Sequence, residues 1–233
     1  MKLAIMQPYI FPYIGYFQLI NAVDTFVFYD DVNYIKRGWI NRNQLLINNQ
    51  AKLFTIPVLK ASQNKLIKEI ELGIDEKWLN HFQTTLEQNY KKAPYYKETI
   101  GIIKKVFNKP HQSISDIAIE SITQISNYIC LKTVFKRSST SFQSSKGLEK
   151  ADRLIDITKK CNSITYINPS GGRELYNKRY FKQHGIDLHF IENSIQPYPQ
   201  FNKEFIGGLS IIDVLMFNSK EEIKKKLNQY KLS

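Results

Sequence analysis

Short apolar runs alternate with stretches of helical periodicity in the first and last parts of the chain. The apolar runs predict strands, because runs of this length suit strands buried on both faces. They lie at residues 2–6, 24–32, 133–139, 163–169 and 186–192. Helices are predicted at 15–23, 149–161, 171–185, 209–218 and 219–227. This alternation is typical of an α/β fold, so the sequence predicts one doubly wound, mainly parallel sheet built from both chain ends.

The middle of the chain has a different pattern. Two strand-like runs flank Asn48 and Asn49, which predicts a β-hairpin because Asn tolerates positive φ. A further strand is predicted at 66–72. Amphipathic patterns then predict three helices, the first beginning near Asp75 and the third capped by Ser113 or Ser115. We therefore expect a single domain over 1–233, with 75–132 as a helical insertion or cap.

Composition places the chain among globular proteins and changes the functional picture little. Hydrophobic residues make up 42% and charged residues 23% of the 233 residues. The formal net charge of +12 suggests nucleic-acid binding as one function. The basic residues are mostly Lys scattered along predicted helices, a distribution that argues against it. We prefer two other interpretations of the charge, a lysine-rich solvated surface and an anionic small substrate.

Two cysteines, Cys130 and Cys161, lie in apolar-periodic segments without a Cys-x-x-Cys partner. We predict a buried free thiol at each, and neither a disulfide nor a zinc site. Reduced thiols and an N-terminus that resembles a first strand rather than a secretory leader predict a cytoplasmic protein. No apolar run approaches the length of a membrane span.

Candidate chemistry clusters where predicted strands end, which is where open parallel sheets bind ligands. The first segment is QPYIFPYIGYFQ, which follows the strand at 2–6. Its turn would present backbone N–H groups and tyrosine hydroxyls to an anionic ligand. Gln7, Tyr9 and Tyr13 are the candidate binding residues, with hydrophobic packing under a loop as the alternative, which we prefer for Phe11 and Phe17.

The second segment, YDDVNYIKRGWINRN, follows the strand at 24–32. Asp30 and Asp31 end an apolar run, where adjacent carboxylates are costly unless they meet a metal, a cation or a substrate amine. Lys36, Arg37 and Arg42 come next and suit phosphate recognition. The alternative is an internal salt bridge among these five charged groups.

Two asparagines in the same segment, Asn41 and Asn43, flank Arg42 and offer amides to sugar hydroxyls. In the third segment, Ser170, Gly171 and Gly172 lie between a predicted strand and a predicted helix. This turn is either an anion-binding turn or a plain connection, since it matches neither glycine-rich phosphate motif. The four histidines lack metal-ligand spacing, and serine-hydrolase and zinc-peptidase motifs are absent from the sequence.

The stretches MQPYIFPYIGYFQLI, DTFVFYDDVNYIKRGWINRN and INPSGGRELY resemble the WbqC-like family of bacterial proteins, over essentially the whole chain. The resemblance implies a role in O-antigen or other surface-polysaccharide biosynthesis, acting on a nucleotide-activated sugar. Acyl or aminoacyl transfer to an amino sugar is one reaction of that kind. The opening stretch also resembles, more distantly, nucleotide-binding enzymes such as pantothenate synthetase. The histidine pair of those enzymes is replaced here by Tyr13-Ile14-Gly15-Tyr16, which counts against an adenylating mechanism that needs it.

Our sequence-based hypothesis is a cytoplasmic transferase that modifies a nucleotide sugar. Asp30 or Asp31 would act as general base or hold a divalent cation. Lys36, Arg37 and Arg42 would bind the diphosphate or a carboxylate. Tyr9 and Tyr13 would stack on a base or sugar, and the 170–172 turn would bind an anionic group. The alternative is a non-catalytic sugar- or nucleotide-binding protein, or a scaffold, of a glycan assembly pathway.

Overall fold

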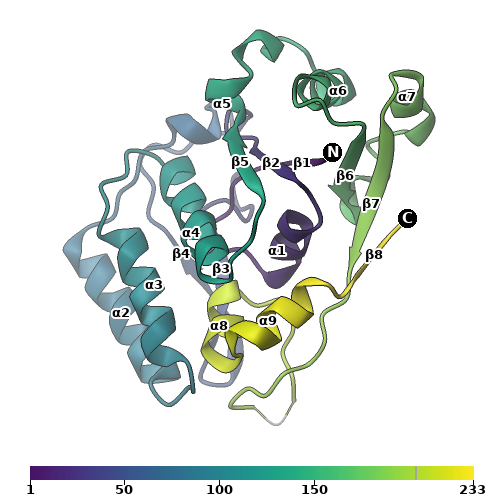
Figure 1. Cartoon of the computed structure of the whole chain (residues 1–233). Coiled ribbons are helices and arrows are strands. Elements are labelled where there is room, and N and C mark those ends of the chain that lie inside the picture. Colours follow the sequence, from purple (N-terminus) through teal and green to yellow (C-terminus); the bar gives the residue numbers. More distant parts are fainter. Residues whose placement is uncertain (203) are drawn as a thin grey trace.

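A six-stranded sheet forms the centre of the molecule (Figure 1). The computed structural model describes residues 1–202 and 204–233. The strand order is β5-β2-β1-β6-β7-β8, and all neighbours are parallel except β7 and β8. The strands are β1 (Lys2–Met6), β2 (Thr25–Phe28), β5 (Val134–Arg137), β6 (Thr165–Pro169), β7 (Asp187–Asn193) and β8 (Tyr230–Leu232). The predicted mainly parallel α/β sheet is therefore confirmed.

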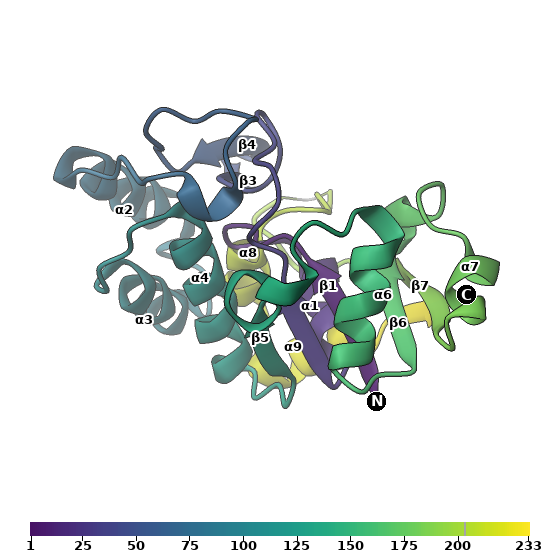
Figure 2. The same ribbon diagram turned by 90° about the horizontal axis from the view of Figure 1, so that it is seen from above.

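Helices cover both faces of this sheet (Figure 2). Successive strand residues point to opposite faces, so β1, β2, β6 and β7 each contribute to two apolar cores. Leu3 of β1 packs with Leu154 and Phe181 in one core, whereas Ala4 packs in the other core with Phe17. The first core involves α6 (Lys150–Lys160) and α7 (Lys178–Gln183); the second involves α1 (Ile14–Asn21), α8 (Ile211–Phe217) and α9 (Lys220–Leu227). Burial on both faces explains why the central strands β1 and β2 are apolar runs.

The hairpin and the central helices form as their local signals predict. Asn48 and Asn49 both adopt positive φ, 50° and 61°, between β3 (Arg42–Ile47) and β4 (Gln50–Thr55). The Asp75 side chain accepts from the backbone of Trp78 and caps the first helix, and Ser113 caps the third. The three helices are α2 (Glu76–Tyr90), α3 (Tyr96–Phe107) and α4 (Ile114–Tyr128). They pack into the same apolar core as α1 and α8.

A buried carboxylate joins α8 to the hairpin side of the molecule. Asp213 is fully buried and accepts hydrogen bonds from the hydroxyls of Tyr90 at 2.9 Å and Tyr198 at 2.7 Å. The Gln200 amide donates a third, at 2.8 Å. The Tyr90 hydroxyl in turn accepts from the backbone N–H of Leu46. Burial raises the pKa of Asp213 above its ordinary value, although the three donors act in the opposite direction.

Several sequence predictions are corrected by the structure. The strand predicted at 66–72 is instead a single 3-10 turn, η1 (Ile67–Glu69), because Ile67 and Ile70 lie three residues apart and are both buried. The helix predicted at 171–185 forms only from Lys178, where the Asn177 side chain caps it. Its first part is the 3-10 turn η3 (Ser170–Gly172) and a connecting segment. The chain does not end in a helix, because β8 follows α9 and pairs antiparallel with β7.

Two further short elements lie after β5, and the first of them shortens the strand predicted at 133–139. These are α5 (Ser138–Ser141) and the 3-10 turn η2 (Gln143–Ser145). Of the two cysteines, Cys161 is buried as predicted, whereas Cys130 is exposed, so that part of the prediction is wrong. Cys130 follows the last turn of α4 with φ of 60°, and the reversal of the chain there turns its side chain outward.

Candidate functional site

A cleft opens where the strand order of the sheet reverses. From β1 the chain moves outward to β2 and then β5, and it later returns to β6 on the other side of β1. Ligands of open α/β sheets bind outside the carboxyl ends of the strands at such a switch point. The cleft has a volume of about 580 Å³. It is lined by Ile5, Met6, Gln7, Tyr29, Val32, Asn33, Ile35, Leu154, Tyr166, Asn168, Pro169, Gly171, Gly172, Leu175 and Tyr176.

One wall of the cleft is the connection after β6, and a close approach of side chain to backbone shapes it. Asn168 accepts a hydrogen bond from the buried Tyr166 hydroxyl at 2.9 Å and donates to the carbonyl of Pro169 at 3.0 Å. Its amide lies against Gly172, where a Cβ atom would come within 1.9 Å of Asn168 Nδ2. Gly172 is therefore needed here for space, and η3 stays close to the strand end. Ser170 is exposed beside this wall.

The opposite wall begins at the end of β1. The Tyr16 hydroxyl of α1 donates to the backbone carbonyl of Gln7 at 2.9 Å, which holds this residue at the strand end. The Gln7 side chain lines the cleft and accepts a long hydrogen bond, 3.4 Å, from the hydroxyl of Tyr9. Of the first predicted segment, Gln7 thus lies in the cleft. Phe11 and Phe17 are buried in the core, as expected for packing residues.

Tyr29 connects the cleft with a buried charge network. Its ring lines the cleft, and the guanidinium carbon of Arg153, on α6, lies 4.8 Å from the ring centroid. Arg153 is itself buried and pairs with Asp31, Nη2 to Oδ2, at 2.5 Å. Burial raises the pKa of Tyr29, while the nearby Arg153 charge acts against that rise. Tyr29 is thus a protonated phenol at neutral pH.

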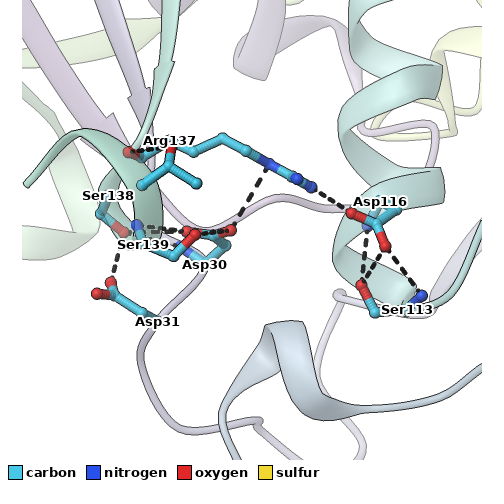
Figure 3. A network of polar contacts seen from close by, with 8 residues as sticks. Asp30, Asp31, Ser113, Asp116, Arg137, Ser138 and Ser139 are labelled. Carbon is cyan, nitrogen blue, oxygen red and sulfur yellow. Dashed lines mark hydrogen bonds and ion pairs between the residues drawn. The ribbon is translucent and has the colours of Figure 1, made fainter. Parts of the chain in front are cut away.

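The side chains of Asp30 and Asp31 turn into this network (Figure 3). Asp30 is 1% exposed and accepts hydrogen bonds from the backbone N–H and hydroxyl of Ser139 at 3.0 and 2.8 Å. The Ser138 hydroxyl lies between the two carboxylates and contacts both. Arg137 Nε lies 3.6 Å from Asp30. The same guanidinium pairs with Asp116 at the start of α4.

This network ties together the ends of β2 and β5 and the helices α4 and α6. The positive charge that two adjacent carboxylates require comes from Arg137 and Arg153. The aspartates therefore do form internal salt bridges, which is the alternative interpretation of the sequence. Their partners are Arg137 and Arg153, however, and not the basic residues of the second segment. The described residues contain no cluster of three or more His, Cys, Asp or Glu side chains that could hold a metal ion.

The basic residues of the second segment lie outside the cleft. Lys36 and Arg37 are exposed in the turn that follows Ile35, and Arg37 has φ of 59°. Arg42 folds back onto the same turn, where its Nε donates to the carbonyl of Gly38 at 2.8 Å. Lys36 and Arg37 thus directly follow Ile35, which lines the cleft, while Arg42 stabilises the turn that carries them.

The two asparagines of that segment are buried connectors. Asn41 accepts from the Tyr34 hydroxyl at 2.8 Å and donates to the carbonyl of Ile56 at 2.9 Å. Asn43 donates to the carbonyl of Phe11 at 2.8 Å. Both amides therefore join the second segment to neighbouring backbone.

Sequence reasoning missed the residues that contact the aspartates. Ser138, Ser139 and Arg137 lie more than a hundred residues after Asp30, and nothing in the local pattern distinguishes them from an ordinary strand end. Arg153 lies on α6, most of whose residues are polar. The single signal that could have found it is an arginine on the apolar stripe of that helix, next to Leu154 and Ile157.

Comparison with known proteins identifies the family of this chain. The model of the WbqC-like protein family matches residues 7–225. The chain belongs to the WbqC-like family. A similar protein is "Uncharacterized protein Rv1507c" of Mycobacterium tuberculosis (strain ATCC 25618 / H37Rv), 28% identical over 221 residues, which are 93% of each chain. No solved structure gives a significant match.

The three stretches that carry the WbqC-like resemblance meet around the cleft. The first contributes Met6 and Gln7 to the lining. The second contributes Tyr29, Val32, Asn33 and Ile35, and the third contributes Asn168, Pro169, Gly171, Gly172, Leu175 and Tyr176. No helix among the described residues is long and apolar enough to span a bilayer. For this WbqC-like chain, the switch point of the sheet and the family motifs thus point to one place.

Proposed function

We propose that this protein is an enzyme of surface-polysaccharide (O-antigen) biosynthesis that binds a nucleotide-activated sugar in the cleft and modifies the sugar. The observation that carries the proposal is the cleft of about 580 Å³ at the switch point. Folds of this class bind nucleotides at that position. Its volume lies within the roughly 300–1,000 Å³ of pockets that enclose small molecules. Membership of the WbqC-like family supports the biosynthetic context.

The lining suits a ligand with a flat base and several hydroxyl groups. Tyr29 and Tyr176 offer aromatic rings, and Ile5 and Leu154 offer apolar surface for stacking and packing. Gln7 supplies an amide that both donates and accepts, as sugar hydroxyls require. In this proposal the diphosphate lies toward the mouth, where the exposed turn after Ile35 carries two positive charges.

Asp30 and Asp31 remain the predicted catalytic residues, and their hydrogen bonds limit the roles that they can have. Their carboxylates are hydrogen-bonded within the protein, so as they stand they orient Tyr29 and the end of β2. A role as general base requires that a substrate amine displace the Ser138 or Ser139 hydroxyl from one carboxylate. Acyl or aminoacyl transfer to an amino sugar is a reaction that would use such a base.

A second candidate function is a non-catalytic nucleotide-sugar-binding protein of the same pathway. The observation in its favour is that the cleft is lined by amides, phenols and apolar side chains, while both carboxylates have internal partners. The two functions make different predictions about turnover. A binding protein leaves the nucleotide sugar unchanged, whereas a transferase consumes a donor.

The test combines binding with product analysis. The melting temperature is measured with UDP-, dTDP-, GDP- and CMP-sugars, because a ligand that binds the folded state stabilises it by about 2.7 kcal/mol at a hundred times its Kd. Gln7→Ala and Tyr176→Ala should each weaken binding about tenfold or more, whereas Gln88→Ala on the exposed face of α2 should not. Failure of every sugar nucleotide to stabilise the protein would contradict the proposal. Mass spectrometry of mixtures with acyl donors then separates the enzyme from the binding protein.

A further inference from the structure

A second, smaller hollow lies beside the cleft. It has a volume of about 260 Å³ and is distinct from the switch-point cleft. Three aromatic rings dominate its lining, which consists of Tyr9, Pro12, Tyr13, Trp39, Asn43 and Gly208. The hollow is smaller than the roughly 300–1,000 Å³ of pockets that enclose drug-sized ligands. Its size suits a single ring.

The rings of the hollow are held in place by neighbouring elements. The Tyr13 hydroxyl accepts a hydrogen bond from Asn193 Nδ2 at 2.7 Å, at the end of β7. Gly15 makes this possible, because a Cβ atom there would lie 2.3 Å from both the Tyr13 ring and the Asn193 amide. The Tyr9 ring packs against Tyr16 with 5.8 Å between centroids. The site is therefore built before a ligand arrives, which lowers the entropy cost of binding.

Trp39 is the exposed ring of the set. Trp39 is 47% exposed, although indole is one of the largest apolar side chains. The Arg42 guanidinium lies 5.9 Å from the ring centroid and steadies it from within the same turn. An exposed, oriented indole beside two tyrosines offers a flat surface for the apolar face of a ring.

The hydroxyl groups of the hollow are neutral donors. Burial raises the pKa of Tyr9 to about 12 and also raises the pKa of Tyr13. Both phenols therefore keep their protons at neutral pH. Because Tyr13 accepts from Asn193, its own O–H remains available to a ligand. Neutral donors and flat rings together match the hydroxyls and the apolar face of an uncharged sugar.

The hollow continues the walls of the cleft. Gln7 lines the cleft and Tyr9 lines the hollow, and a hydrogen bond of 3.4 Å joins their side chains. On the other wall, Ile35 lines the cleft and Trp39 lines the hollow, four residues later on the same turn. Two ligands bound in the two cavities would thus be neighbours along the same pair of segments.

We infer that this aromatic hollow is a second subsite that binds one pyranose ring of a second, uncharged sugar, beside a nucleotide-activated sugar in the cleft. The inference rests on the proposed function only for the nucleotide sugar in the cleft, and the binding of a pyranose to the hollow can be measured without it. Trp39 is the principal stacking residue, and Tyr13 is the principal hydrogen-bond donor. Tyr9 separates the two sites.

The experiment uses saturation-transfer NMR with the methyl glycosides of glucose, galactose and N-acetylglucosamine as probes. At least one glycoside should bind the wild-type protein, and Trp39→Ala should weaken it about tenfold or more. The matched control is Phe201→Ala, which removes a ring of similar exposure, 45%, outside the hollow. Absence of binding by all three glycosides, or equal binding to wild type and Trp39→Ala, would overturn the inference.

A parallel titration with a UDP-sugar separates this inference from the proposed function. If the UDP-sugar binds, Trp39→Ala should leave its Kd within about twofold, because the indole lies outside the cleft. A loss of UDP-sugar affinity in Trp39→Ala would show that the hollow belongs to the same ligand and would overturn the assignment of a second sugar. If no UDP-sugar binds but a glycoside does, the proposed function fails while the pyranose subsite stands.

Discussion

The pair of Asp31 and Arg153 offers the sharpest test of how the cleft wall is built. The change is Asp31→Ala, which leaves the Arg153 guanidinium buried without its carboxylate. The two side chains are only 5% and 7% exposed, so water cannot replace the lost partner. Removing one member of a buried pair costs roughly 3–5 kcal/mol. We expect Asp31→Ala to lose that much of its free energy of unfolding.

A surface pair supplies the matched control. Lys182 and Asp187 are also in contact, but their side chains are 71% and 48% exposed. Exposed pairs contribute about 0–1 kcal/mol, so Asp187→Ala should change the free energy of unfolding by no more than that. Urea unfolding followed by circular dichroism measures both variants, with equal slopes indicating that stability alone has changed.

A double variant then tests whether the loss of stability comes from the unpaired buried charge or from lost packing. Asp31→Leu with Arg153→Met replaces the charged pair by apolar side chains, a replacement that is often close to neutral in buried sites. The double variant should therefore be more stable than Asp31→Ala. If Asp31→Ala loses no more stability than Asp187→Ala, the pair does not support the fold and our reasoning about the network is wrong.

The same variants bear on the predicted catalytic role of Asp31. If Asp31 only supports the fold of the cleft wall, the double variant should bind the nucleotide sugar and turn it over as wild type does. If Asp31 is the general base, the double variant should bind the nucleotide sugar but form no product. Stability and turnover thus report on different roles of one carboxylate.

Two further predictions concern other buried groups. Burial raises the pKa of Asp213, so the folded protein holds this proton more tightly than the unfolded chain. Its contribution to stability is complete below the unfolded pKa of about 4 and is lost as the pH rises through the folded pKa. The stability of wild type relative to Asp213→Asn, measured by urea unfolding, should thus fall with rising pH; a rise would contradict this. In Gly172→Ala the new Cβ would lie 1.9 Å from the Asn168 amide, so we expect a loss of about 1–3 kcal/mol and weaker UDP-sugar binding in a thermal-shift titration. Gly171→Ala, with no atom within 4 Å, should stay within about 0.5 kcal/mol of wild type; equal losses in the two variants would refute the role of the close approach.

Much of the fold follows from local signals in the sequence. The strands β1, β2, β6 and β7 and most helices lie where the apolar patterns predict them, because a buried parallel strand needs a continuous apolar run. The turn at Asn48 and Asn49 and the caps at Asp75 and Ser113 also form as predicted. Elements without a strong local signal were missed or wrongly assigned. They include the three-residue strand β8 and the turn η1, whose form depends on contacts made elsewhere in the chain.

The candidate site, too, could be predicted only in part from the sequence. The sequence alone determined that three motifs follow strand ends, and the parallel sheet then brings those ends to one edge. Only the tertiary structure decided the orientation of the side chains within the motifs. Asp30 and Asp31 turn to arginines and serines more than a hundred residues away, because a buried carboxylate needs partners that only the folded chain provides. Gln7 and Tyr9, two residues apart, line different cavities, and a hydrogen bond joins their side chains. Local preferences select the elements, whereas pairing of buried polar groups across the fold selects where each functional side chain points.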